Sequence, residues 1–131
     1  METVNGTLRR KHVLIVDDDI SLAWSLKETL EHDGYEATIV PDGGLALKFV
    51  QAHQLDAVVC DLQMSRVEGD LLYATVERSN PALARRFIFI TGLDDYPLFQ
   101  KFIDTTSLPA LHKPVALEAL RGEVERVAEQ S

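Results

Sequence analysis

The stretch HVLIVDDD, from His12 to Asp19, places three consecutive aspartates directly after an apolar run. The run Val13–Val16 is typical of a buried strand. Two like charges about 4 Å apart repel by roughly 4 kcal/mol at an effective dielectric constant near 20. Unless something balances them, Asp17, Asp18 and Asp19 raise one another's pKa values and weaken the fold. The stretch therefore predicts a buried strand and raises the question of what neutralises the charges at its end.

The same alternation continues along the chain, because short apolar runs are separated by longer amphipathic segments. Strands are expected at residues 12–17, 35–40, 56–61, 86–91 and 108–113. Helices are expected at residues 21–34, 44–53, 69–80, 97–105 and 116–130. Five units of this kind with nearly unbroken apolar strands predict an α/β fold, in which a parallel sheet is covered by helices on both faces.

Length and composition narrow the class of protein. A chain of 131 residues fits one domain, which we expect at residues 11–128, with loose ends at 1–10 and 129–131. The net charge of -8 disfavours direct binding to the DNA backbone. A single cysteine, Cys60, cannot form an internal disulfide, which fits a reducing cytoplasm. No apolar run resembles a signal peptide or a membrane span, so we expect a soluble cytoplasmic protein with no membrane partner.

Polar residues stand at the carboxyl ends of four of the five expected strands. They are Asp17, Asp18 and Asp19 at the end of the first strand, Asp61 at the end of the third, Thr91 at the end of the fourth and Lys113 at the end of the fifth. In an open parallel sheet, ligands bind at the carboxyl ends of the strands, where the strand order reverses. We therefore expect these acids, the hydroxyl and the amine to converge at one edge of the sheet.

This set of side chains suits phosphoryl transfer, which depends on positioning and charge neutralisation. Mg²⁺ prefers oxygen ligands, so Asp17, Asp18 and Asp61 are candidate metal ligands. Asp61 is also placed to act as a nucleophile and become an aspartyl phosphate. The ammonium group of Lys113 could pair with one phosphate oxygen, and the hydroxyl of Thr91 could donate a hydrogen bond to another.

The first expected helix has signals at both ends and one unusual residue. Asp19 precedes it and is expected to cap its amino end, and Gly34 stands where a C-terminal glycine belongs. Trp24 lies about 200° around the helix from Leu22, which belongs to the apolar stripe. Its ring either packs against a neighbouring helix or serves as a docking anchor for a partner protein.

Alternation in two strands predicts which side chains are buried on which face. Phe87 and Phe89 are expected on one face of the fourth strand, and Ile88 and Ile90 on the other. Cys60 alternates away from Asp61, so we expect its thiol in the core.

The chain resembles the receiver domain of bacterial two-component response regulators. The matching pieces are VLIVDDD, VVCDLQM with Gly69 eight residues after Asp61, FIFITG and LHKPV, and the resemblance covers roughly residues 11–128. It implies a flavodoxin-like α/β fold, a doubly wound five-stranded parallel sheet in the order 2-1-3-4-5 with five helices. Parts of the sequence look most like receivers attached to hybrid sensor kinases.

The resemblance also implies a role for each site residue. Asp61 would accept a phosphoryl group from a histidine kinase or a histidine phosphotransfer protein. Asp17 and Asp18 would be the acidic pair for Mg²⁺, and the backbone carbonyl of Gln63 would be a further ligand. Thr91 would be the switch hydroxyl, and Lys113 the family's lysine, with a cis peptide before Pro114. The first helix, which carries Trp24, would meet the phosphotransfer partner.

Two positions depart from the family pattern. Ser65 stands where the family has proline after the methionine that follows the acceptor, so we expect altered loop mobility and phosphoryl lifetime. Ala110 stands three residues before Lys113, where many members carry a tyrosine or phenylalanine that rotates on phosphorylation. The usual aromatic signal cannot operate in the same way here.

Three other functions are alternatives to that of a phosphoacceptor. The chain has no G-x-x-x-x-G-K-[ST] run, which excludes a P-loop NTPase on motif grounds. A phosphatase with an aspartyl-phosphate intermediate needs an acid two residues after its nucleophile, where this chain has Gln63. A receiver-like interaction module that is never phosphorylated ranks second, because all the chemical residues are present.

Overall fold

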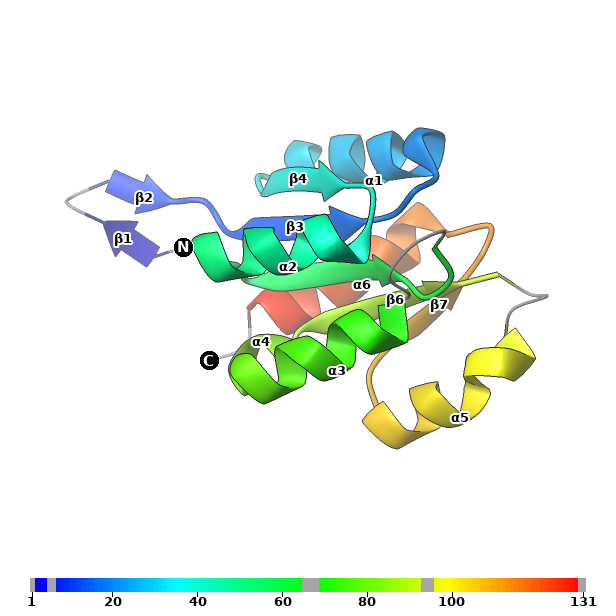
Figure 1. Ribbon diagram of the computed structural model, residues 1–131. Coiled ribbons are helices and arrows are strands. Elements are labelled where there is room, and N and C mark those ends of the chain that lie inside the picture. The colour runs from blue at the N-terminus through cyan, green and yellow to red at the C-terminus, as the bar shows by residue number, and fades with distance from the viewer. Residues whose placement is uncertain (1, 5–6, 65–68, 93–95, 130–131) are drawn as a thin grey trace.

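The computed structural model describes residues 2–4, 7–64, 69–92 and 96–129. Its centre is a five-stranded parallel sheet with the spatial order β4-β3-β5-β6-β7, which runs through the middle of Figure 1. These strands are β3 (His12–Val16), β4 (Glu36–Val40), β5 (Ala57–Asp61), β6 (Phe87–Thr91) and β7 (Ala110–His112). Counted along the chain within this sheet, the order is 2-1-3-4-5, so the predicted doubly wound fold is confirmed.

Six helices accompany the sheet in the described part of the chain, where the sequence predicted five. They are α1 (Ile20–His32), α2 (Gly43–Ala52), α3 (Gly69–Ser79), α4 (Pro81–Ala84), α5 (Tyr96–Thr106) and α6 (Leu117–Ala128). The extra helix is the single turn α4. Pro81 suits a first helical position, and the Asn80 side chain accepts the Leu83 N–H at 3.2 Å. The Asn80-Pro81 pair therefore starts a short helix as well as ending α3.

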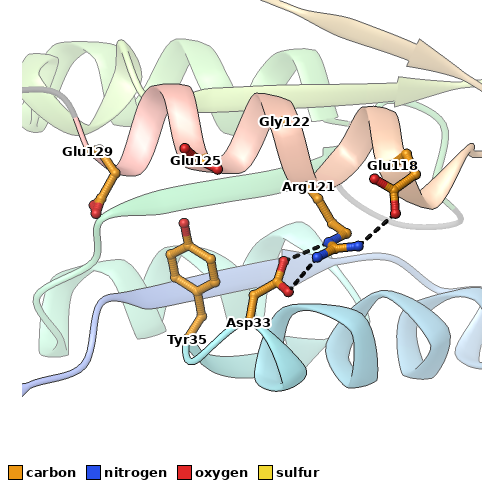
Figure 2. Close-up of a pocket in the computed structure, with 7 residues that line it drawn as sticks. All are labelled: Asp33, Tyr35, Glu118, Arg121, Gly122, Glu125 and Glu129. Atoms are coloured by element: carbon orange, nitrogen blue, oxygen red, sulfur yellow. Dashed lines mark hydrogen bonds and ion pairs between the residues drawn. The ribbon is translucent and has the colours of Figure 1, made fainter.

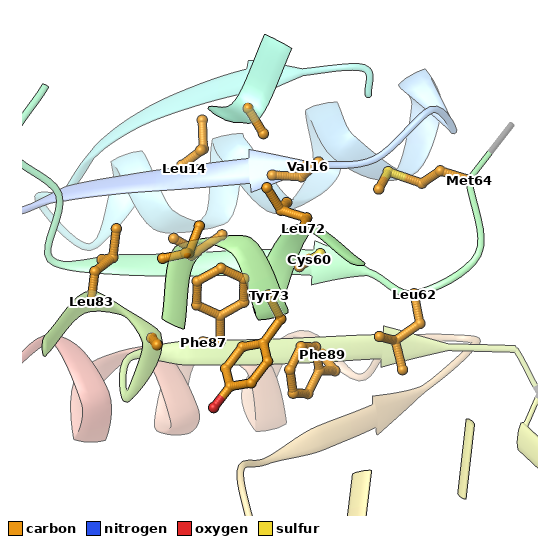
Figure 3. Close-up of a cluster of buried hydrophobic side chains, with 14 of the residues drawn as sticks. Leu14, Val16, Cys60, Leu62, Met64, Leu72, Tyr73, Leu83, Phe87 and Phe89 are labelled. Atoms are coloured by element: carbon orange, nitrogen blue, oxygen red, sulfur yellow. The ribbon is translucent and has the colours of Figure 1, made fainter. Parts of the chain in front are cut away.

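The two faces of the sheet carry separate clusters of buried side chains. Figure 3 shows the first, in which Phe87 and Phe89 of β6 pack with residues of α2, α3 and α5. The second lies under α1 and α6 and includes Ile88 and Ile90. The predicted alternation along β6 is therefore confirmed. Cys60 is fully buried in the first cluster, as predicted.

Both ends of α1 follow the predicted signals. At the amino end, Asp19 Oδ1 accepts the Leu22 N–H at 3.2 Å. At the carboxyl end, Gly34 has a φ of +94°, which an L side chain rarely adopts. Its N–H donates to the Glu31 carbonyl at 3.0 Å, and the Tyr35 N–H donates to the Leu30 carbonyl at 3.1 Å. This pair of bonds is the Schellman motif that ends many helices.

The N-terminal segment, expected to be a loose end, contains two short strands. Strands β1 (Glu2–Val4) and β2 (Thr7–Arg9) pair antiparallel. The intervening dipeptide is Asn5-Gly6, a strong sequence signal for a hairpin. The Arg9 guanidinium also bonds both oxygens of Asp56, at 3.1 and 3.2 Å, which ties β2 to the main sheet. The boundaries 11–128 stay a prediction.

No helix in the described ranges is long and apolar enough to cross a membrane.

Candidate functional site at the carboxyl edge of the sheet

Three carboxylates meet where β3 and β5 end. Asp17 directly follows β3, Asp61 is the last residue of β5, and the register pairs the residues before them, Val16 and Cys60. One oxygen from each of Asp17, Asp18 and Asp61 lies within 4.8 Å of the others. Asp17 and Asp61 are each 1% exposed, whereas Asp18 is open to solvent. Parallel pairing of two strands therefore brings together acids that lie more than forty residues apart.

Asp17 is a buried acid whose pKa is shifted. Burial is the main cause that raises its pKa to about 7; the Asp19 N–H, which donates at 2.9 Å, acts in the opposite direction, and the neighbouring Asp61 carboxylate adds to the rise. Asp17 Oδ2 is buried and has no hydrogen-bond partner among the described residues. Two facing carboxylate anions cannot donate to each other. The pair therefore needs a shared proton or a cation.

The Asp61 carboxylate is held by one donor on each oxygen. Oδ1 accepts the Gln63 N–H at 3.1 Å, and Oδ2 accepts from Lys113 Nζ, also at 3.1 Å. Burial lowers the pKa of Lys113, but the hydrogen bond and the charge of Asp61 outweigh this, so the pKa of Lys113 is raised. The amine is therefore a cation at neutral pH. It is positioned by the turn after β7, where the peptide to Pro114 is cis, as the resemblance implies.

Thr91 ends β6 beside the acceptor strand and is buried. Its Oγ1 donates to the Gly92 carbonyl at 3.3 Å, and its own carbonyl accepts the Lys113 N–H at 2.9 Å. The register of β5 and β6 pairs Asp61 with Ile90, so the threonine follows one residue later. Thr91 thus ends β6 and Lys113 directly follows β7, the two strands next to β5 in the sheet, as the strand-end pattern predicts.

Of the two positions that depart from the family pattern, Ala110 lies in the described structure and Ser65 does not. Ala110 pairs with Phe89 across β6 and β7 and is half-buried, without a ring to rotate. Ser65 lies outside the described residues, and so do residues 93–95 in the loop after Thr91. The expectations for these two segments stay predictions.

Trp24 lies on the exposed side of α1, about one turn after Ile20, the first residue of the helix. Its side chain is 51% exposed, as is that of Ile20 at the start of the same helix. The Lys27 ammonium lies 5.9 Å from the centre of the indole ring. The ring is not packed into the core, so the docking interpretation of Trp24 remains open to test.

A groove on the α1–α6 side of the molecule lies away from these strand ends. It has a volume of about 520 Å³ and is lined mainly by acids of α6 and the turn after α1 (Figure 2). Arg121 crosses it, with Nε and the second guanidinium nitrogen donating to the Asp33 carboxylate at 2.8 and 3.0 Å. A further bond of 2.6 Å reaches Glu118. This exposed network joins α6 to the end of α1 and contains none of the predicted site residues.

One buried acid escaped the sequence analysis because it lies at the opposite end of the sheet. Asp56 stands just before β5 and accepts the His12 N–H at 2.8 Å in addition to the Arg9 guanidinium. Arg86 lies 3.9 Å away. An aspartate at the amino end of an apolar strand can indicate a buried acid, but the partners of Asp56 are remote in sequence and could not be predicted. It connects β2, β3 and β5 rather than forming part of the phosphoryl-transfer site.

The same fold occurs in a known family. The family model for the response regulator receiver domain matches residues 13–125. The chain therefore belongs to the response regulator receiver domain family. Domains of this family are the signalling phosphoacceptors of two-component regulatory systems and interact with histidine kinases or phosphotransfer proteins.

Curated relatives extend beyond the matched region. The chain is 28% identical over 114 residues to the transcriptional regulatory protein ZraR of Escherichia coli K12. The aligned region covers 87% of this chain and 25% of ZraR. It is 31% identical over 108 residues to the response regulator MprA of Mycolicibacterium vanbaalenii, covering 82% and 46%. The chain thus spans about a quarter to a half of the length of these relatives.

Solved structures agree with the fold. The receiver domain of the Francisella response regulator 1452 matches with a TM-score of 0.79 and 25% identity, covering 92% of this chain and 98% of that one. A CheY-like receiver domain protein from Methanospirillum hungatei matches with a TM-score of 0.80 and 25% identity, covering 92% and 95%.

Proposed function

We propose that this chain is a phosphoacceptor of a two-component phosphorelay, phosphorylated on Asp61. The observation that carries the proposal is the buried Asp61 carboxylate, which bonds the Lys113 ammonium and lies in a cluster with Asp17 and Asp18. A site built only to stabilise the fold would not leave Asp17 Oδ2 without a partner in the described structure. An acid that is to receive a phosphoryl group needs this combination of cations and oxygen ligands.

The donor set fits Mg²⁺. Asp17, Asp18 and Asp61 would hold the ion with carboxylate oxygens. The backbone carbonyl of Gln63 would add a further oxygen ligand, as the resemblance implies. The unpartnered Asp17 oxygen is the feature that a cation would satisfy. When bound, the ion would supply positive charge that offsets the acids and the incoming phosphoryl group.

The transfer itself requires little from the protein beyond position and charge. An oxygen of Asp61 forms a bond to phosphorus, and the bond from phosphorus to the donor nitrogen breaks with its electron pair leaving on that nitrogen. Lys113, already on Asp61 Oδ2, pairs with a phosphoryl oxygen, and the Thr91 hydroxyl donates to another. The product is a mixed anhydride on Asp61.

We infer that the donor is a histidine kinase or a histidine phosphotransfer protein, which meets the exposed face of α1 around Trp24. The chain acts in the cytoplasm as a signalling phosphoacceptor, with self-phosphorylation from a donor and slow autodephosphorylation as its only chemistry. The charge of -8 argues against direct contact of this domain with nucleic acid.

Acetyl phosphate labelling tests the metal and the reaction together. We expect covalent labelling in Mg²⁺ and almost none in excess chelator, measured by intact mass at matched ionic strength. Equal labelling in chelator would remove the metal from the proposal. An absence of labelling under all conditions would favour the interaction module that is never phosphorylated.

A further inference from the structure

Gly69, the first residue of α3, lies directly against the main chain of the acceptor strand. It is buried, and its N–H donates to the Leu62 carbonyl at 3.1 Å. The amino end of α3 is therefore fixed to the backbone one residue beyond the acceptor.

A side chain at position 69 would have no space. A Cβ there would lie 2.9 Å from Leu62 Cα and 2.9 Å from Cys60 Sγ, and closer still to the Asp61 carbonyl oxygen. Two of these three neighbours are main-chain atoms, which cannot rotate away as a flexible side chain can. Only glycine therefore allows α3 to approach the acceptor strand this closely.

The backbone that Gly69 contacts is the same backbone that orients the acceptor carboxylate. The Leu62 N–H donates to the Ile90 carbonyl at 2.9 Å, which fixes the end of β5 against β6. One residue later, the Gln63 N–H donates to Asp61 Oδ1 at 3.1 Å. A shift of the Asp61–Leu62 backbone would therefore move both the acceptor carboxylate and the donor on its Oδ1.

We propose that Gly69 is a positioning residue for phosphoryl transfer, which holds the Asp61–Leu62 main chain so that the Asp61 carboxylate meets the Gln63 N–H and the Lys113 ammonium. The inference rests on the proposed function of Asp61 and adds a residue that does not touch the phosphoryl group. Its effect reaches the site through the backbone alone.

Gly69→Ala is the direct test, with acetyl phosphate and Mg²⁺ as the donor mixture. Overpacking at one position usually costs less than the whole stability of a small domain, so the variant is expected to fold. We expect labelling of Asp61 between about tenfold and about a hundredfold slower than wild type, because small misplacements of a reacting group have effects of this size. In the metal-free protein, the amide shift of Gln63 should also move.

Three control variants separate positioning from loss of stability. Gly122→Ala lies in α6, where a Cβ meets nothing within 4 Å, and should label like wild type. Val76→Ala removes buried volume from α3 away from Asp61, and should reduce the free energy of unfolding without slowing the labelling of the folded protein. Cys60→Ala combined with Gly69→Ala removes one of the three close contacts. It should recover stability relative to Gly69→Ala but not the labelling rate.

Each outcome decides between the alternatives. Gly69→Ala that labels at the wild-type rate would overturn the assignment. Two results with the Cys60→Ala/Gly69→Ala double variant would also overturn it: a labelling rate that recovers together with stability, or a protein that does not fold. In either case Gly69 would act only in folding. If wild type itself is not labelled, the proposed function fails. An unchanged Gln63 amide shift in metal-free Gly69→Ala would then count separately against the positioning role.

Discussion

Asp17 combines deep burial with a carboxylate neighbour and an oxygen that has no partner among the described residues. Burial raises its pKa to about 7, so the folded protein favours the neutral acid relative to the unfolded chain, whose value is 3.8. At pH values between 3.8 and about 7, folding is therefore accompanied by proton uptake at Asp17. The contribution of Asp17 to stability is fully present below pH 3.8 and is lost as the pH rises through about 7.

We expect Asp17→Asn to be more stable than wild type in chelator at pH 8, by up to a few kcal/mol, since one pKa unit corresponds to about 1.4 kcal/mol. The advantage should shrink as the pH falls toward 4, where wild-type Asp17 is itself neutral. Urea unfolding at several pH values would measure both quantities. A stability difference that stays constant across this range would show that the charge of Asp17 is not what strains the metal-free site.

Asp56 shows how one buried acid can join three strands at the other end of the sheet. Burial alone would raise its pKa, but the hydrogen bonds from the Arg9 guanidinium and the His12 N–H outweigh burial, so the pKa of Asp56 is lowered. The folded state therefore favours the anion. The contribution of Asp56 to stability is present above pH 3.8 and is lost as the pH falls through the lower value of the folded state.

Asp56→Asn should lower the free energy of unfolding by roughly 1.5–3 kcal/mol at pH 7, the usual range for hydrogen bonds to a charged group. The difference from wild type should narrow in acid, where wild-type Asp56 also loses its charge. Asp104→Asn, which removes an exposed charge from α5, is the matched control and should change stability little. A loss from Asp56→Asn that is no larger than the control's would contradict the role of this acid as a tie between strands.

Helix α1 presents one face to the core and leaves Trp24 and Ile20 half-exposed, and it begins directly after the aspartates that follow β3. An exposed tryptophan on this helix is a candidate anchor for a partner. Acetyl phosphate needs only the strand-end residues, whereas a protein donor must also contact a surface. The two donors therefore separate docking from chemistry.

Trp24→Ala should slow phosphotransfer from the cognate protein donor at least about tenfold, as expected where an interface residue contributes 1.4 kcal/mol or more. Labelling by acetyl phosphate should stay close to wild type. Leu71→Ala provides the control, because Leu71 is a large apolar side chain that is 59% exposed on α3. Equal rate losses with both donors, or equal effects of the two substitutions on the protein donor, would remove Trp24 from the docking surface.

The molecule as a whole shows which features local sequence signals can predict. The caps at Asp19 and Gly34 depend on residues within a few positions, and the strand pattern places Asp17, Asp61, Thr91 and Lys113 at one edge because parallel strands end together. The ion pair between Arg9 and Asp56 joins residues 47 positions apart, so no local sequence signal could predict the pairing. The same holds for the unpartnered oxygen of Asp17 and for the space around Gly69, which depend on how β3, β5 and α3 pack.

Intact-mass analysis of the wild type and of Asp61→Asn, each incubated with acetyl phosphate and Mg²⁺, tests the central claim most directly. The asparagine keeps the shape of the side chain but removes the nucleophilic carboxylate and the negative charge that faces Lys113. We predict the mass increase of one phosphoryl group on wild type, mapped to Asp61, and none on the variant. Full labelling of Asp61→Asn, or labelling of wild type at any other residue, would contradict the assignment of Asp61 as the phosphoacceptor.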